Sequence, residues 1–289
     1  MPGKRLTPTS KPAPATGRPI VIVGVGHMGG AIAHGLIAAG MGSKLILIDP
    51  ALKPAAVRAY RKAGATTSID ADILADKNPE ALIFAVKPQM MPQTVPAYAK
   101  AARNAVVISI AAGTQIESLR HWLGAPKAVV RAMPNLPASI GRGISAAHAT
   151  RTTTAAQRKL AERLLRCMGD LVWLDGEELI NAVTAVSGSG PAYVFLLAEA
   201  MAAAGERLGL PHDVAATLAR KTIEGVGALL AANPAAPADL RRSVTSPGGT
   251  TEAALKVLMT GARFEQLMAE AIAAANARGF ELAKIREQT

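Results

Sequence analysis

Several residue types on which whole classes of protein depend are scarce in this sequence. Among its 289 residues Cys167 is the only cysteine, which excludes an internal disulfide and a cysteine-rich metal cluster. Leu164, Leu165 and Met168 lie close to it in the sequence, so we interpret Cys167 as a small core residue rather than a nucleophile. Aromatic residues make up only 3% of a chain that is 50% hydrophobic. The core is therefore aliphatic, which suits helices and the strands of a buried parallel sheet.

Long apolar runs without interruption are missing as well. A long uncharged run, 180–198, contains Ser187-Gly188-Ser189-Gly190-Pro191, which we expect to end any spanning helix. Residues 1–17 lack the apolar core of a signal peptide and are rich in Pro, Thr and Lys, so we expect a disordered tail there. The sequence thus predicts a cytoplasmic protein with no membrane span.

Two further function classes lose support from the distribution of charged residues and histidines. The 32 Lys and Arg against 21 Asp and Glu give a net charge of +11, but the positive residues are scattered and not interleaved with aromatics. We therefore expect a surface that attracts anionic ligands rather than nucleic acid. The five histidines form no i,i+4 ligand pair and join no Ser/Asp constellation. Neither a metal site nor a hydrolytic triad is expected.

The first half alternates buried-strand patterns with helical patterns. Nearly continuous apolar runs predict strands at 19–23, 45–48, 81–86, 105–110 and 127–131, and helical patterns cover 31–39 and 54–63. Such alternation implies right-handed crossovers and a mostly parallel sheet. We predict an α/β, Rossmann-like dinucleotide-binding domain over residues 18–176.

A glycine-rich turn between the first strand and the first helix is the strongest local signal in this domain. It reads Gly24, Val25, Gly26, His27, Met28, Gly29. Glycines let the chain turn tightly and let a pyrophosphate approach the helix N-terminus, so these six residues are predicted to bind the cofactor. A plain tight turn is the alternative.

Asp49 ends the second strand, twenty positions beyond the last glycine of the turn. A carboxylate there usually accepts a hydrogen bond from the ribose 2′-hydroxyl of NAD and repels the 2′-phosphate of NADP. Lys53 and Arg58 are close enough in sequence to neutralise such a phosphate. NAD and NADP both remain open, and Asp49 could instead cap the turn that follows it.

Small or polar residues follow the later strands, at the edge where a Rossmann ligand lies. Lys87 faces the nicotinamide ribose or the substrate, unless it is a solvated loop lysine. The residues predicted to bind the cofactor at these strand ends are Val86, Lys87, Pro88, Ala111, Ala112, Gly113 and Asn135.

After about Asp175 the strand pattern disappears. Apolar residues recur at helical spacing over 215–230 and 264–275, and 191–208 is apolar almost all round, as expected of a helix enclosed by others. We predict an all-α domain over 177–289 that buries its faces against a second copy, giving at least a homodimer. Two small-residue turns, 187–191 and 246–251, lead into helices and could bind a carboxylate, or could be ordinary N-caps.

Together these motifs resemble the pyrroline-5-carboxylate reductase family. The matching blocks follow the family's order over nearly the whole chain after the tail, and the last two are the most specific: Gly-x-Gly-x-Met-Gly at 24–29, Ala-Val-Lys-Pro at 85–88, Ser-Ile-Ala-Ala-Gly at 109–113, Arg-Ala-Met-Pro-Asn at 131–135, Ser-Gly-Ser-Gly-Pro-Ala-Tyr at 187–193 and Ser-Pro-Gly-Gly-Thr-Thr at 246–251. The resemblance implies reduction of 1-pyrroline-5-carboxylate to L-proline by NADPH or NADH. It also implies a helical domain that interlocks two subunits, with dimers able to assemble into decamers.

The resemblance also implies roles for particular residues. Thr251 is expected to be catalytic, by a hydrogen bond from its hydroxyl to the ring nitrogen that assists protonation. The substrate is expected to lie against Ser246, Gly248, Gly249 and Thr250, to which the residue patterns add Ser187 and Lys87. A protonated cyclic imine is already electrophilic, so positioning it beside the nicotinamide accounts for most of the catalysis.

The sequence departs from the family pattern at three places. His27 replaces the usual Asn or Gln of the glycine turn, and Asp49 stands where many members have Thr or Ser. The segment 237–242 replaces a His-Pro-Gly-x-Leu-Lys-Asp stretch, so that Arg242 is gained near the substrate turn. These changes leave cofactor preference and substrate affinity open.

Other functions fit less of the sequence. A β-hydroxyacid dehydrogenase needs a lysine on the helix predicted over 191–208, which has none. A reductase of another cyclic imine would use the same chemistry and stays open. A non-catalytic dinucleotide-binding protein or a nucleic-acid-binding protein would have no use for the turn at 246–251.

Overall fold

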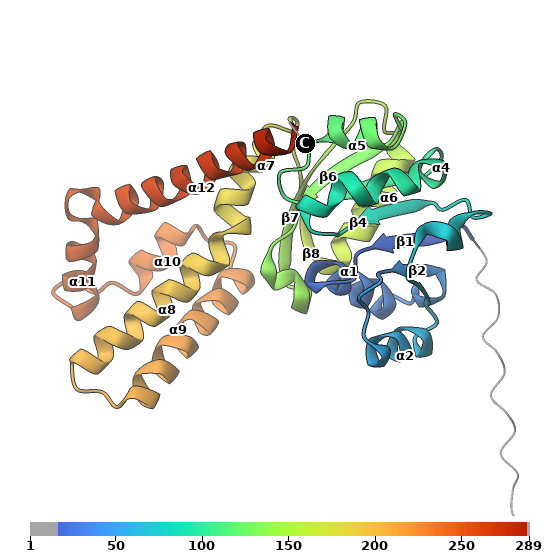
Figure 1. The fold of residues 1–289 in the computed structure, drawn as a ribbon. Coiled ribbons are helices and arrows are strands. Elements are labelled where there is room, and N and C mark those ends of the chain that lie inside the picture. Colours follow the sequence, from blue (N-terminus) through green and yellow to red (C-terminus); the bar gives the residue numbers. More distant parts are fainter. Residues whose placement is uncertain (1–16, 288–289) are drawn as a thin grey trace, which may run out of the picture. The chain divides into compact units, whose positions relative to one another are not determined.

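The computed structural model describes residues 17–287, with side chains up to Glu281. The expected disordered tail therefore lies outside the described residues except for Gly17. The chain forms two compact units. One contains the chain up to Val183 and takes up the end of the last helix from Gly279, and the other is Thr184–Arg278. Figure 1 shows the strands confined to the first unit, while the second is helical.

A single eight-stranded sheet forms the centre of the first unit. Its spatial order is β3-β2-β1-β4-β5-β6-β7-β8; neighbours up to β6 are parallel, β7 is antiparallel to β6, and β8 is parallel to β7. The mostly parallel sheet is thus confirmed. The strands are β1 Ile20–Val23, β2 Leu45–Ile48, β3 Thr66–Ser68, β4 Ala81–Phe84, β5 Val106–Ser109, β6 Val129–Met133, β7 Gly143–Ala149 and β8 Gly169–Trp173.

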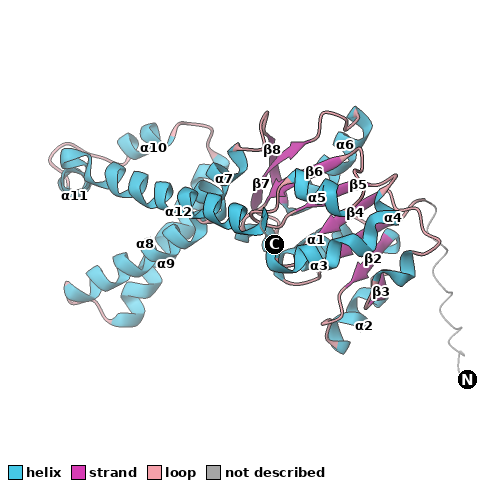
Figure 2. Cartoon of the chain, turned by 45° about the horizontal axis from the view of Figure 1, so that its top comes forward, coloured by secondary structure: helices cyan, strands magenta, loops and turns pink. Residues whose placement is uncertain are grey.

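Helices cover both faces of this sheet, which explains why its central strands are continuous apolar runs. One buried core includes Ile32 of α1 and Leu164 of α6, and the other includes Met91 of α3 and Leu119 of α5 (Figure 2). The helices are α1 His27–Ala38, α2 Pro54–Lys62, α3 Met91–Thr94, α4 Ala99–Ala102, α5 Ile116–Trp122, α6 Ala155–Leu165 and α7 Leu179–Val183.

The structure corrects several sequence-based boundaries in this unit. The first helix begins at His27, inside the glycine turn, and not at Ala31. Three strands were not predicted, β3, β7 and β8, because none of them is a continuous apolar run buried on both faces: each contains polar residues and positions that are exposed or only partly buried. An apolar run is the signal of a strand buried on both faces, so strands near the sheet edge lack it.

The second unit consists of helices, and no strand follows Asp175 in the described part of the chain, as predicted. Its helices are α8 Gly190–Arg207, α9 His212–Ala232, α10 Pro237–Ser243, α11 Thr250–Met259 and α12 Arg263–Glu287, of which α12 ends in the first unit. Helices α8 and α9 pack side by side (Figure 1). Gly205 of α8 faces Ala215 of α9, and a Cβ on it would lie 3.4 Å from Ala215 Cβ, an ordinary van der Waals contact.

The prediction that residues 187–191 end a helix is wrong. The chain stays helical from α7 into α8 through a π-helical turn, Thr184–Gly188, closed by the Ser189 N–H donating to the Thr184 carbonyl at 2.8 Å. Pro191 lies in the first turn of α8, where its missing N–H costs no hydrogen bond. The Tyr193 hydroxyl donates to the Ala185 carbonyl at 3.0 Å and so ties α8 back to the wide turn.

The expectation that α8 is enclosed by other helices is not met within the single chain. No α8 residue is buried, and the side chains of Phe195 and Leu196 are 56% and 64% exposed. Only Ala185, Ala215 and Ala219 are buried apolar residues between Thr184 and Arg278. The apolar surface of this unit therefore lies open.

Candidate active site

The three glycines of the turn after β1 have distinct structural roles. Gly24 has φ +86°, and a Cβ there would lie 2.7 Å from the backbone nitrogen of Val86. A Cβ on Gly29 would lie 2.0 Å from the Gly24 carbonyl oxygen. A Cβ on Gly26 would meet no atom within 4 Å. The outer two glycines therefore let the turn pack against β4 and α1, whereas the middle one leaves open space at the N-terminus of α1, where a ligand phosphate can approach the backbone.

Asp49 connects the end of β2 to the glycine turn. Its Oδ2 accepts the Val25 N–H at 2.7 Å, and its Oδ1 accepts the Ala51 N–H at 2.8 Å. The side chain thus caps the turn that follows it, as the alternative interpretation holds, and also fixes the glycine turn. Each carboxylate oxygen keeps acceptor capacity for a further donor, such as a ribose hydroxyl.

A cavity of about 550 Å³ opens at the carboxyl ends of the first strands, and we call it the glycine-loop pocket. Five predicted residues line it: Gly24, Gly26, Asp49, Val86 and Lys87. The pocket lies where β1 neighbours both β2 and β4, the point at which the strand order reverses, and open α/β sheets bind ligands at such points. Its size is that of a cofactor pocket, and the residues present fit a dinucleotide.

The other predicted cofactor residues are not in the lining of this pocket. His27 is the exposed first residue of α1, and Met28 packs partly against the core. Asn135 has a structural partner, because its Oδ1 accepts the Ile144 N–H at 3.0 Å. The remaining residues outside the lining are Val25, Gly29, Pro88, Ala111, Ala112 and Gly113.

Sequence reasoning missed part of the pocket wall. Ile69 and Asp70 follow the unpredicted strand β3, and Met90, Thr94 and Tyr98 come from the segment after β4. Burial, and then the nearby Asp70 carboxylate, raise the pKa of Tyr98 to about 12, so its hydroxyl stays protonated. Recognition of Thr66–Ser68 as a strand would have placed residues 69 and 70 at the same sheet edge.

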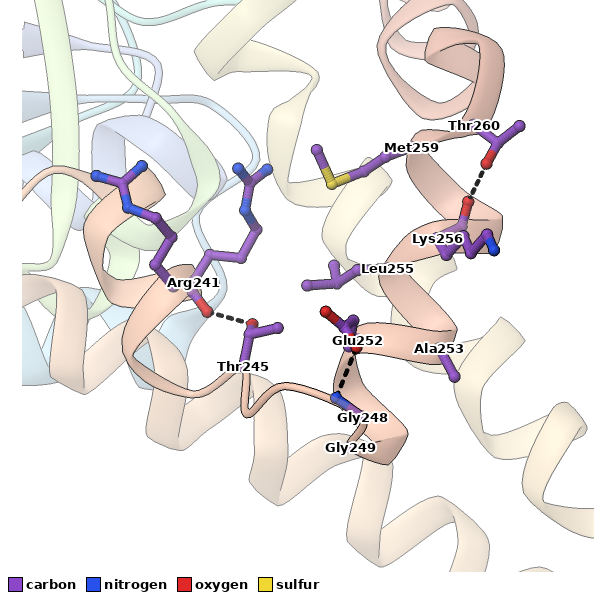
Figure 3. Close-up of a pocket in the computed structure, with 11 residues that line it drawn as sticks. Arg241, Thr245, Gly248, Gly249, Glu252, Ala253, Leu255, Lys256, Met259 and Thr260 are labelled. Atoms are coloured by element: carbon purple, nitrogen blue, oxygen red, sulfur yellow. Dashed lines mark hydrogen bonds between the residues drawn. The ribbon is translucent and has the colours of Figure 1, made fainter.

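The predicted substrate turn lies in the helical unit, at the start of α11. Gly248 has φ +71°, and the Gly249 N–H donates to the Ser246 carbonyl at 3.0 Å. The Glu252 carboxylate accepts the Gly248 N–H at 2.7 Å (Figure 3). The N–H groups of the first helical turn have no intrahelical acceptor, so the start of α11 presents donors and positive potential to an anion.

Beside this turn the same unit contains a cavity of about 850 Å³, which we call the α10–α11 pocket (Figure 3). Gly248 and Gly249 line it, together with the basic residues Arg241, Arg242 and Lys256. Arg242 also forms an ion pair with Asp239. Glu252 is the one acidic residue among the described residues of the lining, so basic groups outnumber acidic ones, which suits an anionic ligand.

The remaining predicted substrate residues are placed differently. Ser246, Thr250 and Thr251 are exposed and do not line the α10–α11 pocket. Ser187 lies half-buried in the π-helical turn. No group of His, Cys, Asp or Glu in the described residues has the geometry of a metal site.

The fold and the glycine-loop pocket define a dinucleotide-dependent oxidoreductase, and comparison with known proteins identifies the family. Residues 19–113 match the family described as NADP oxidoreductase coenzyme F420-dependent, and residues 177–282 match pyrroline-5-carboxylate reductase dimerisation. The chain is 42% identical to a pyrroline-5-carboxylate reductase of Pseudomonas aeruginosa, over 92% of this chain and 97% of that one. It belongs to the pyrroline-5-carboxylate reductase family.

Solved structures agree with this assignment. A pyrroline-5-carboxylate reductase from Coxiella burnetii superposes with a TM-score of 0.85 at 34% identity, over 92% of this chain and 98% of that one. The Plasmodium falciparum pyrroline carboxylate reductase, a structure with NADP bound, gives a TM-score of 0.77 at 25% identity over the same shares of the two chains.

The helical stretch Leu179–Arg207 is long and apolar enough to cross a membrane, judged by length and composition alone. Core helices of soluble proteins pass the same test. This stretch lies in the segment that matches the dimerisation domain, so a protein partner accounts for its apolar surface equally well.

Proposed function

We propose that this chain reduces 1-pyrroline-5-carboxylate to L-proline, the last step of proline biosynthesis, with a hydride from NADH or NADPH. One observation carries the proposal: a dinucleotide-sized pocket behind a glycine turn occurs on the same chain as a small-residue turn at a helix N-terminus. That second turn belongs to a segment matching the dimerisation domain of this reductase family. When bound, the cofactor supplies the hydride to the ring carbon of the C=N bond.

The cofactor is assigned to the glycine-loop pocket and the adjacent strand ends. Gly26 leaves room for the pyrophosphate, and the α1 N-terminus donates to it. Asp49 holds the adenosine ribose, and the small residues Ala111, Ala112 and Gly113 leave room for the flat nicotinamide ring. Lys87 lies at the nicotinamide end of this pocket. The remaining proposed cofactor residues are Gly24, Val25, His27, Met28, Gly29, Val86, Pro88 and Asn135.

The substrate is assigned to the turn that begins α11. Gly248 and Gly249, whose N–H groups bond within the turn, leave the substrate carboxylate room to approach the backbone, and Thr250 holds it through its N–H and its hydroxyl. Ser246 and Ser187 add hydroxyls to this group. Thr251 is the proposed catalytic residue, because its hydroxyl is the donor for the ring nitrogen. Its position in the first turn of α11 puts this hydroxyl near the helix N-terminus, where positive potential favours a bound carboxylate.

The catalytic contribution of these residues is mainly positional. A protonated cyclic imine accepts hydride readily, so holding its carbon against the nicotinamide is the principal requirement. The turn binds the carboxylate at one end of the ring, and Thr251 fixes the nitrogen, which together orient the reacting carbon. No acid or base with a strongly shifted pKa is needed.

Asp49 supports a preference for NADH. Its carboxylate is held by the two backbone N–H groups described above, so it remains at the pocket wall when the cofactor enters. A fixed carboxylate at this place accepts a ribose 2′-hydroxyl and repels a 2′-phosphate.

The working protein is proposed to be a homodimer, or a decamer of such dimers, in the cytoplasm. Monomeric soluble proteins rarely expose large apolar patches, and the helical unit exposes many large apolar side chains, Phe195 and Leu196 among them. The proposed domain division, a dinucleotide-binding domain over 18–176 and a substrate-binding and dimerisation domain over 177–289, is supported by the matched range 177–282.

Initial rates with purified protein test the proposal. NADH and NADPH oxidation is followed with 1-pyrroline-5-carboxylate and with a six-membered cyclic imine carboxylate. We expect turnover with the five-membered ring, and a fall of kcat/KM by about 100-fold in Thr251→Ala, as for loss of one transition-state hydrogen-bond donor. The affinity for NADH should stay unchanged in this variant.

Glu265→Gln is the control, since this exposed residue lies near the start of α12, outside the proposed site. Turnover confined to the larger ring would replace the proposed substrate. A normal kcat/KM in Thr251→Ala would reject the role given to its hydroxyl.

A further inference from the structure

An ion pair between buried Arg131 and Glu177, whose side chain is 25% exposed, lies outside the proposed binding residues and holds three segments of the first unit together. Arg131 of β6 is 4% exposed, and its Nη1 lies 2.9 Å from Glu177 Oε1. The same oxygen accepts the backbone N–H of Ile116 at 2.8 Å. One carboxylate oxygen therefore ties a central strand to the first residue of α5.

The two ends of this link are places where the proposed chemistry has strict geometric demands. Ile116 directly follows the loop 110–115, which connects β5 to α5. This loop contains the residues assigned to the nicotinamide. At the other end of that loop, Ser109 pairs with Arg131 in the sheet, and its Oγ accepts the Ala111 N–H at 3.3 Å. The loop is thus held on both sides by groups that meet at Arg131.

Glu177 lies shortly before the helical unit that contains the substrate turn. It stands between β8 and α7, and α7 runs into the π-helical turn with which the helical unit begins. A shift of Glu177 relative to β6 would therefore move the start of this connection relative to the loop 110–115.

Burial of the Arg131 charge costs desolvation free energy, which the ion pair only partly offsets. Arg131 Nε and Nη2 have no hydrogen-bond partner among the described residues. Buried ion pairs of this kind are often no more stabilising than apolar residues of the same volume, whereas an unpaired buried charge is strongly destabilising. Stability alone is thus a poor reason for the arrangement, and its value lies in the fixed geometry.

We propose that Arg131 and Glu177 are positioning residues for hydride transfer, and this inference rests on the proposed function. They fix the loop assigned to the nicotinamide against the start of the chain segment that is proposed to hold the substrate. Their loss should lower the rate of the chemical step more than it weakens the binding of either ligand, since displacements of about 1 Å can cost as much as 100-fold in rate.

Two variants and one control separate positioning from stability. Glu177→Gln keeps the shape but removes the charge, and the double change Arg131→Met with Glu177→Met replaces the pair with apolar groups. Glu162→Gln is the matched control, since Glu162 pairs with Arg166 at 2.8 Å on the surface of the same unit. For each protein kcat, both KM values and the melting temperature are measured. The primary isotope effect on kcat is measured with NADH carrying deuterium at the transferred position.

For Glu177→Gln we expect kcat to fall about tenfold or more, within the range that misplacement produces, and both KM values to change by less than about threefold. The isotope effect on kcat should rise, because the chemical step becomes slower than product release. The double variant should recover most of the melting temperature but not kcat, since Ile116 still lacks its acceptor. The control should match the unmodified protein in every measurement.

Recovery of kcat together with stability in the double variant would assign the pair a purely structural role and overturn the inference. An unchanged kcat and isotope effect in Glu177→Gln would do the same. If Glu177→Gln does not fold, the double variant decides alone. Absence of turnover by the unmodified protein would instead refute the proposed function, so the two failures are distinguishable.

Discussion

The substitution Asp49→Asn tests how this protein selects its cofactor. The carboxylate stands at the end of β2 in the wall of the glycine-loop pocket, and backbone N–H groups hold both of its oxygens. Asparagine has nearly the same shape but no charge. We therefore expect the ratio of kcat/KM with NADPH to kcat/KM with NADH to rise.

The magnitude follows from two electrostatic contributions. A 2′-phosphate carries a charge of about −1.5 to −2, and at roughly 5 Å with an effective dielectric constant of about 40 each unit charge is repelled by about 1.7 kcal/mol. Loss of a charge-assisted bond to the 2′-hydroxyl of NADH costs about 1 kcal/mol more. Solvent screening reduces the sum to about 2 kcal/mol, or roughly a 30-fold change of the ratio.

The assay is a set of initial rates with both cofactors at saturating 1-pyrroline-5-carboxylate. An amide can replace only one of the two carboxylate acceptors, so Asp49→Asn also loosens the glycine turn. This effect is common to both cofactors and cancels in the ratio. Asp70→Asn is the control, because Asp70 lines the same pocket but lies after β3. An unchanged ratio in Asp49→Asn, or an equal shift in the control, would refute the argument.

Three further predictions follow from local geometry. Gly26→Ala should keep the melting temperature of the unmodified protein yet bind NADH at least about tenfold more weakly, because its methyl group enters open ligand space. Gly29→Ala should lower the melting temperature, since its methyl group would lie 2.0 Å from a backbone carbonyl oxygen. Leu196→Lys, at a side chain 64% exposed on α8, should shift the mass measured by light scattering toward the monomer, whereas Ile140→Lys, 77% exposed in the first unit, should not. Burial raises the pKa of the Cys167 thiol from 9.0 to about 12. The unfolded chain therefore loses this proton at lower pH than the folded protein, so the free energy of unfolding falls as pH rises between these values. Cys167→Ala should reduce this fall, measured as the difference between urea melts at about pH 8 and pH 10.5.

The sheet and the glycine turn were predictable because their signals are local. The central strands are buried on both faces, so β1, β2 and β4 are apolar throughout and β5 is apolar up to Ser109. The turn needs glycine where a Cβ would strike the backbone. The edge strands lack this requirement. Thr66–Ser68 is only partly buried, and missing it also hid Ile69 and Asp70 in the pocket wall.

Contacts between distant segments had no local signal. The link from Arg131 to Glu177 spans 46 positions, and the bond from Asp49 to Val25 spans 24. The motif around Arg131 was visible in the sequence, but its partner lies in a connector with no recognisable pattern. The sequence therefore predicted residues that line the glycine-loop pocket, but it did not predict the contacts that hold them in place.

The segment 187–193 shows how a local rule can fail where support comes from farther along the helix. Glycine and proline lower helix propensity, which led to the wrong prediction of a break. The small residues instead permit a wide π turn, a feature that is frequent at functional sites in helices. Pro191 needs no N–H at its position, and the Tyr193 hydroxyl binds the Ala185 carbonyl within the turn. The glycine and proline residues of this segment thus act together with Tyr193, which stabilises the turn that they form. As a result, Ser187 lies in an irregular turn of an otherwise continuous helix.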